Sequence, residues 1–142
     1  MVRYDAFLLL SRDNNYSRES LQCLEKSNLN KEINLYISTT NDLFINLNHL
    51  INLEKFKLVL HKKKFDTLFD HMICLTEYSN SKYISFLHDD DLFDKNYFLN
   101  SHRILSKYSP TALSNRTQFI DRFSKKHKRR NPKPKNKIIK LN

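Results

Sequence analysis

The chain has 142 residues, enough for one domain with a hydrophobic core, and it contains no glycine. The Walker A loop and the Rossmann dinucleotide fingerprint both need glycine where the backbone approaches phosphate, so the composition excludes these two phosphate cradles. The formal net charge is +10, but residues 122–142 carry ten Lys and Arg and no acid, whereas residues 1–121 carry 15 basic and 15 acidic residues. The basic character therefore belongs to the end of the chain.

Apolar runs typical of strands alternate with segments of helical periodicity from residue 6 to residue 120. The continuous apolar run 6–10 predicts a strand that is buried on both faces of a sheet. The other expected strands are 33–38, 56–60, 83–87 and 112–120. The expected helices are one capped by Ser17, one capped by Asn41, and the segments 65–78 and 94–108, the last ended by Pro110. This alternation implies right-handed crossovers and a mostly parallel sheet, the α/β class.

Two of the expected helices have apolar residues at spacings that predict an inward face. In the second helix these residues are Phe44, Ile45, Leu47, Leu50 and Ile51. In the segment 65–78 they are Leu68, Phe69, Met72, Ile73 and Leu75. We expect each set to pack against the sheet.

The segment 83–91 reads Tyr-Ile-Ser-Phe-Leu-His-Asp-Asp-Asp, an apolar strand that stops on three carboxylates. Adjacent aspartates repel one another, so a cation or a set of hydrogen bonds is expected to compensate them. Mg²⁺ and Mn²⁺ prefer oxygen ligands, and Mg²⁺ usually takes one or two carboxylates together with substrate phosphate oxygens. The segment therefore predicts a divalent cation site. The simpler alternative is that Asp91 or Asp94 caps the helix that follows.

Three expected loops lie where ligands of parallel sheets bind, beyond the carboxyl ends of the strands. They are residues 11–14, 38–42 and 89–91, and we expect them to converge on one pocket. Asn14 and Asp42 are the pocket candidates of the first two loops, although a turn or a helix cap is the more ordinary role for either residue.

Cysteine and histidine spacing predicts no further site. Cys23 and Cys74 lie in apolar helical patterns, which is typical of reduced core residues in a cytosolic protein. No apolar run reaches the length of about 18 residues that a membrane span needs, and the stretch 7–10 is too short for a signal peptide. We expect a cytoplasmic protein, peripheral at the inner face of the membrane at most. Four histidines without metal spacing are expected in surface or packing positions: His49, His61, His71 and His102.

The segment 83–91 resembles the Tyr-Ile-x-Phe-Leu-Asp-x-Asp-Asp segment of the family 2 glycosyltransferases, which have a GT-A fold and carry their DXD metal site there. Leu92, Phe93 and Asp94 continue the pattern toward the next helix. The resemblance covers residues 4–120 and implies a Rossmann-like nucleotide-diphospho-sugar transferase domain, at least in part, within residues 1–121. Residues 122–142, with two prolines among the lysines, predict a disordered basic tail.

The resemblance implies a donor site for a nucleotide-diphospho-sugar, with a UDP-sugar as the first expectation. Asp90 matches the aspartate that holds Mn²⁺ or Mg²⁺ against the donor diphosphate, and Asp89 and Asp91 flank it at the ribose, the metal or the sugar. Asn14 and Asp42 fall in loops that contact the nucleotide. Such a cation neutralises the charge on the departing nucleotide diphosphate. The implied acceptor is a glycan or a lipid-linked glycan, and the implied transfer inverts the anomeric centre.

The chain departs from the family pattern at three places. His88 replaces the first acid of the motif, where it either ligates the metal or orients an aspartate. Residues 38–42 lack the acidic residues that read the base, so the base stays open. No Asp or Glu follows Asp121, although the family takes its general base from the half after the metal site. We therefore expect a truncated, weakly active or inactive form whose catalytic base is unknown.

Other functional classes fit less well. A haloacid-dehalogenase-type phosphatase needs Thr or Val where this chain has Phe93, and a receiver domain needs an acidic pair where it has only Asp13. The non-enzymatic alternative is a module that binds nucleic acid or another anionic polymer through residues 125–140, with an affinity that falls steeply with salt. That alternative leaves the three aspartates unexplained, so we expect no specific nucleic acid and at most contact between the tail and an anionic membrane.

Overall fold

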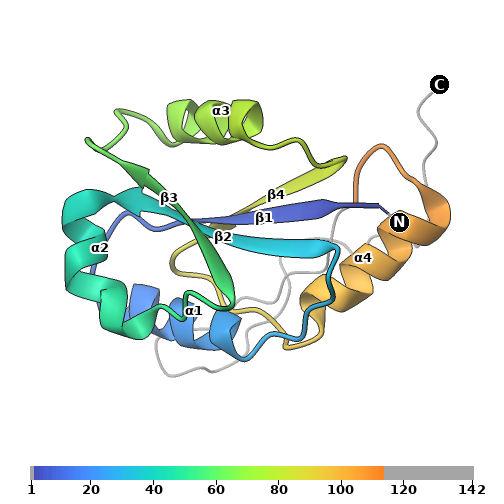
Figure 1. Ribbon diagram of the computed structural model, residues 1–142, viewed down its shortest axis with the longest axis horizontal. Helices are drawn as coiled ribbons and strands as arrows, with labels where there is room; N and C mark the ends of the chain where they lie inside the picture. Colours follow the sequence, from blue (N-terminus) through green and yellow to red (C-terminus); the bar gives the residue numbers. More distant parts are fainter. Residues whose placement is uncertain (1, 114–142) are drawn as a thin grey trace, which may run out of the picture.

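The computed structural model describes residues 2–113, which form alternating strands and helices (Figure 1). In chain order the elements are β1 (Tyr4–Leu9), α1 (Asn15–Glu25), β2 (Ile33–Thr40), α2 (Asn41–Leu47), the 3₁₀ helix η1 (Asn48–Leu50), β3 (Phe56–His61), α3 (Leu68–Tyr78), β4 (Tyr83–His88) and α4 (Tyr97–Tyr108). The predicted α/β class and the order of the first eight expected elements are confirmed, with boundaries that shift by a few residues.

The four strands form one parallel sheet in the order β3-β2-β1-β4. All six residues of β1 are buried, as the continuous apolar run predicted, because β1 has a neighbour on each side and helices on both faces. Leu9 is level with Ser38 of β2 and with His88 of β4, and Thr40 is level with His61 of β3. The carboxyl ends of the four strands therefore meet at one edge of the sheet.

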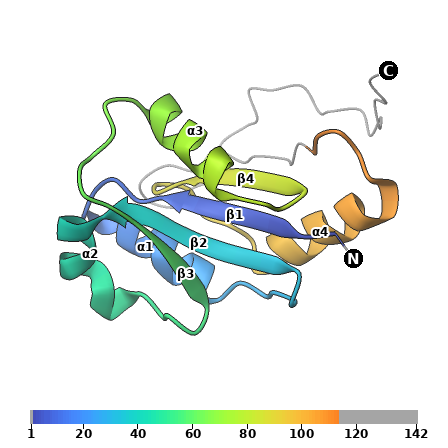
Figure 2. The same ribbon diagram turned by 45° about the horizontal axis from the view of Figure 1, so that its top comes forward.

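The helices cover the two faces of the sheet unequally. Within residues 2–113, α1, α2 and α4 lie on one face and α3 lies on the other (Figures 1 and 2). The larger core, on the first face, includes Leu8, Leu21 and Phe98, all of them fully buried. The smaller core, under α3, has Phe7, Leu9 and Leu75 as its buried members. Successive residues of β1 thus supply opposite cores, because side chains alternate along a strand.

The helices begin at caps that differ from the expected ones. Asn14, and not Ser17, is the N-cap of α1; Ser17 lies three residues later and completes a capping box with it. Thr40, and not Asn41, caps α2 through a bond to the Leu43 amide. In each case the cap is the residue whose side-chain oxygen reaches the free amide at the third helical position, and this depends on where the preceding strand ends.

The third helix starts at Leu68, with Thr67 as its N-cap, instead of at residue 65. Of its expected inward residues only Leu75 is fully buried, whereas Leu68, Phe69 and Ile73 are exposed. Ile45 of α2, also expected inward, is exposed as well. The apolar spacing predicted wider buried helix faces than the structure has. A short helix packed on a four-stranded sheet contacts the sheet with only part of its circumference.

Part of the sequence prediction lies outside the described residues. Residues 112 and 113 form no strand, and the rest of the expected strand 112–120 lies beyond the described part of the chain, as does the basic segment 122–142. None of the helices between residues 2 and 113 is long and apolar enough to cross a membrane.

Phe7 and Phe69, two of the phenylalanines on the α3 side, test this packing. Phe7 is fully buried and stacks on Tyr36 with ring centroids 4.6 Å apart, whereas Phe69 is 68% exposed. We expect Phe7→Ala to lower the free energy of unfolding by about 3–5 kcal/mol, because it leaves a cavity in the smaller core. Phe69→Ala should change it by less than about 0.5 kcal/mol. Urea titration of both variants measures the difference, and equal losses would contradict the orientation of α3.

Candidate functional site

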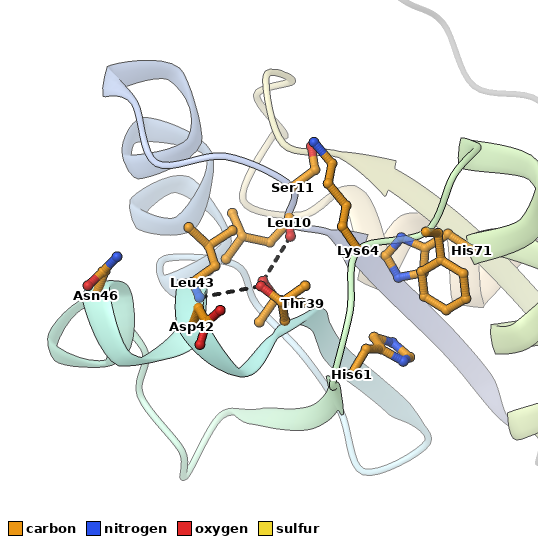
Figure 3. Close-up of a pocket in the computed structure, with 11 residues that line it drawn as sticks. Leu10, Ser11, Thr39, Asp42, Leu43, Asn46, His61, Lys64 and His71 are labelled. Atoms are coloured by element: carbon orange, nitrogen blue, oxygen red, sulfur yellow. Dashed lines mark hydrogen bonds between the residues drawn. The ribbon is translucent and has the colours of Figure 1, made fainter.

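A pocket of about 290 Å³ opens at the carboxyl edge of the sheet (Figure 3). The ends of β1, β2 and β3 meet there with α2 and with the loop and helix that follow β3. Figure 3 shows Asp42, Leu43 and Asn46 of α2 on one side and His61 and His71 on the other. The complete lining is Leu10, Ser11, Thr39, Thr40, Asp42, Leu43, Asn46, His61, Lys64, Phe65 and His71.

Two threonines at the end of β2 shape the floor of this pocket. The Thr39 hydroxyl donates to the Leu10 carbonyl oxygen at 2.9 Å, which fixes the end of β2 against the end of β1. The Thr40 hydroxyl accepts from the Leu43 amide at 3.3 Å, which starts α2 immediately after the strand. Asp42 is therefore held in the first turn of α2, at the pocket wall.

A buried serine joins two histidines at the other wall. The Oγ atom of Ser38 lies 2.8 Å from Nε2 of His61 and 2.6 Å from Nε2 of His71. Ser38 and His61 point to the α3 face of the sheet by strand alternation, and α3 brings His71 to the same point. A hydroxyl has one proton to donate, so with both rings neutral Ser38 donates to one histidine and accepts from the other.

The same wall is aromatic. The ring of Phe65 stacks on His71 with centroids 4.5 Å apart and meets His61 edge-on at 4.8 Å. Burial, with a smaller contribution from His61, lowers the pKa of His71 to about 4, and burial also lowers the pKa of His61. This aromatic wall is therefore uncharged at neutral pH.

The acidic loop, residues 89–91, follows β4 and is tied to the end of β1. Asp89 is 3% exposed. Its Oδ2 accepts from the Ser11 amide at 2.9 Å and the Ser11 hydroxyl at 3.1 Å, and its Oδ1 accepts from Arg12 Nη2 at 2.7 Å. Burial raises the pKa of Asp89, but the hydrogen bonds from Arg12 and Ser11 outweigh it and hold the pKa below its usual value.

The other two aspartates of the loop are more open. Asp90 has a half-exposed side chain whose Oδ2 accepts from Arg12 Nη2 at 3.1 Å. Asp91 makes no side-chain hydrogen bond within the described residues; burial and the charge of Asp90 raise its pKa, and His88 opposes them. His88 is the exposed last residue of β4. Arg12 places a positive charge beside Asp89 and Asp90.

The acidic loop fits a divalent cation only in part. Both oxygens of Asp89 are engaged, so it is poorly placed as a ligand, whereas Asp90 and Asp91 offer the one or two carboxylates that Mg²⁺ or Mn²⁺ usually takes beside phosphate oxygens. No cluster of three or more Asp, Glu, His or Cys residues suited to a metal occurs between residues 2 and 113. A cation here would therefore need further oxygen ligands from water or from a bound molecule.

Some of the remaining predicted residues line the pocket, and others have structural roles. Asn14 uses its side chain to cap α1 and does not line the pocket. Asp94 accepts from the Asn96 amide at 2.8 Å in the turn before α4, but the N-cap of α4 is Asn96, so neither Asp91 nor Asp94 caps this helix. Loops 11–14 and 38–42 do converge: Ser11, Thr39, Thr40 and Asp42 line one pocket. The third loop expected there, residues 89–91, does not line this pocket; Asp89 is hydrogen-bonded to Ser11, which does.

Sequence reasoning missed four residues of the site: Arg12, Ser38 as a bridge, His61 and His71. His49 is exposed and His102 is packed against Asn30 and the Val2 carbonyl, in agreement with the expectation for these two histidines. The position of His61 at the end of an expected strand was the one available signal. His71 gave none, because its place depends on how α3 crosses the sheet. Cys23 and Cys74 are free thiols, half-buried instead of core.

No protein-family model matches this chain, and no curated protein matches it.

The buried histidine predicts a specific loss of stability in acid. The pKa of His71 is depressed in the folded state, so the unfolded chain binds the extra proton between pH 6.5 and about pH 4. Neutral His71 makes its full contribution to the free energy of unfolding above pH 6.5. As the pH falls through this window, the free energy of unfolding drops by about 2–3 kcal/mol at most. Urea unfolding at pH 7.5 and pH 4.5 measures this loss.

His71→Gln, which has an amide for Ser38 and no titration in this range, should lose less stability than the wild type on going to pH 4.5. The exposed His49→Gln is the matched control and should follow the wild type. Identical pH dependences of the wild type and His71→Gln would show that His71 is not held neutral by the fold.

Proposed function

We propose that this chain binds the nucleotide-diphospho-sugar donor of a glycosyl transfer at the carboxyl edge of its sheet, as part of a family 2-like, GT-A-type glycosyltransferase. The pocket takes the base, the acidic loop takes the diphosphate with Mn²⁺ or Mg²⁺, and a glycan or lipid-linked glycan is the acceptor. The observation that carries this proposal is Ser11, which lines the pocket and at the same time binds Asp89 through its amide and its hydroxyl.

Pocket size supports this division of the donor. About 290 Å³ is at the lower end of small-molecule pockets, enough for a heteroaromatic base but small for a whole nucleotide-sugar. Its neutral aromatic wall suits stacking, and Asp42 and Asn46 can bind the donor and acceptor groups at the edge of a base. The charged part of the donor must then extend past Ser11, toward the acidic loop.

The acidic loop supplies the carboxylates that would hold a divalent cation. A divalent cation on Asp90 and Asp91 would neutralise the charge that develops on the leaving nucleotide diphosphate. Asp89 does not face the donor in this scheme, because Ser11 and Arg12 occupy both its oxygens. It holds the end of β1 and the end of β4 at a fixed separation, so the base and the diphosphate are bound in one orientation.

Thermal and urea unfolding with nucleotides test the donor site. The probes are UDP, GDP, CDP, dTDP and ADP, each with and without Mn²⁺. The cognate diphosphate with Mn²⁺, at about 100 times its dissociation constant, should add about 2.7 kcal/mol to the free energy of unfolding. Asp90→Asn should remove the part of this stabilisation that depends on Mn²⁺.

Asp13→Asn is the matched control, since Asp13 lies in the adjacent loop but pairs with Arg18 on the surface. It should keep the stabilisation of the wild type. A chain that unfolds cooperatively and responds to none of the five diphosphates would refute the donor site. A Mn²⁺-dependent part of the response that survives unchanged in Asp90→Asn would refute the role of the acidic loop.

A further inference from the structure

Arg12 is the one basic residue that contacts the acidic loop within the described part of the chain. Its Nε and Nη2 atoms converge on a single oxygen, Oδ1 of Asp89, at 3.2 and 2.7 Å. The usual two-oxygen fork with a carboxylate is prevented because Ser11 already occupies the other oxygen of Asp89. Arg12 is thus anchored at one edge of its guanidinium.

The two carboxylate contacts of Arg12 differ in strength. Asp89 is buried, and a buried carboxylate that loses its cation costs several kcal/mol, so this contact persists. The bond to Asp90 is a single hydrogen bond of 3.1 Å between two side chains that are each about half exposed, at 50% and 51%. Such surface pairs contribute about 0–1 kcal/mol. The Asp90 contact is therefore the one that a stronger ligand can replace.

Some N–H groups of the Arg12 guanidinium are not engaged by residues 2–113. Of its five N–H groups, those of Nη1 bind nothing within residues 2–113. Arginine binds phosphate through two parallel N–H groups, which is the geometry that an anchored, half-exposed guanidinium offers. Arg12 follows Ser11, the residue that joins the pocket to the acidic loop, so it lies on the path that the diphosphate of a pocket-bound nucleotide must take.

We propose that Arg12 binds the diphosphate of the donor, and that Asp89 is its positioning residue and not a ligand of the nucleotide. This inference rests on the proposed donor site and deepens it. In the free protein Arg12 balances Asp90. When the donor arrives, the guanidinium stays anchored on Asp89 and exchanges Asp90 for phosphate oxygens, which leaves Asp90 available to the divalent cation.

The test distinguishes binding of the phosphates from binding of the base. The probes are inorganic pyrophosphate, UDP and uridine, measured by calorimetry in Mn²⁺ on the wild type, Arg12→Gln, Arg12→Lys and Arg18→Gln. Arg18 is the matched control because it is an exposed arginine paired with Asp13 outside the site. Arg12→Gln should bind pyrophosphate and UDP at least about tenfold more weakly, the loss expected from a charged hydrogen bond, and uridine within about twofold.

Arg12→Lys, which keeps the charge without the planar fork, should recover part of the loss, and Arg18→Gln should match the wild type. If Arg12→Gln weakens uridine as much as UDP, Arg12 acts by holding the loop together and the proposal is overturned. Unchanged UDP and pyrophosphate binding in Arg12→Gln also overturns it, while the donor site stands. A wild type that binds neither pyrophosphate nor any of the five nucleoside diphosphates refutes the donor site together with this inference.

Discussion

A buried carboxylate holds this site together. Asp89 directly follows β4 and is almost fully inside the protein, so its charge must be compensated there, and within residues 2–113 the compensation comes from Ser11 and Arg12, just after β1. Ser11 and Arg12 can reach it only because β1 and β4 are neighbours in register, with Leu9 level with His88. Parallel pairing of these two strands and charge compensation of Asp89 therefore depend on each other. The pocket and the acidic loop are placed by the same contact.

The opposite end of the sheet shows that compensation by a cation is not the only solution. Asp5 is also a buried carboxylate, but it accepts from the Asn34 amide at 2.8 Å and the Ser79 hydroxyl at 2.6 Å. Neutral donors are sufficient for Asp5. At Asp89 an arginine is used, and only part of its guanidinium is consumed. Unused N–H donors of Arg12 thus remain at the carboxyl edge of the sheet, where ligands of parallel sheets bind.

Particular elements show which features the chain predicted and which it did not. The run 6–10 predicted a doubly buried strand because side chains alternate between the two faces of a strand, so an unbroken apolar run needs cover on both, and β1 is such a strand. Phe69 and Ile73 were expected inward by the same kind of pattern and are exposed. Periodicity shows which side of a helix is apolar, but the area of sheet available to cover that side is a property of the whole fold. The helix caps were misplaced for a related reason, since a cap is selected by where the preceding strand ends.

The sequence by itself determined the α/β class, the parallel sheet, and the convergence of three loops on one edge, because strand and helix periodicities and the right-handed crossover rule are local or nearly local. It also located the acidic residues at the end of a strand. Only the tertiary structure decided what those residues do. Whether Asp89 faces a ligand or an arginine, and whether His61 and His71 lie apart or share Ser38, depends on contacts between residues distant in the chain. Such contacts are set by strand order and helix placement, and no spacing along the sequence encodes them.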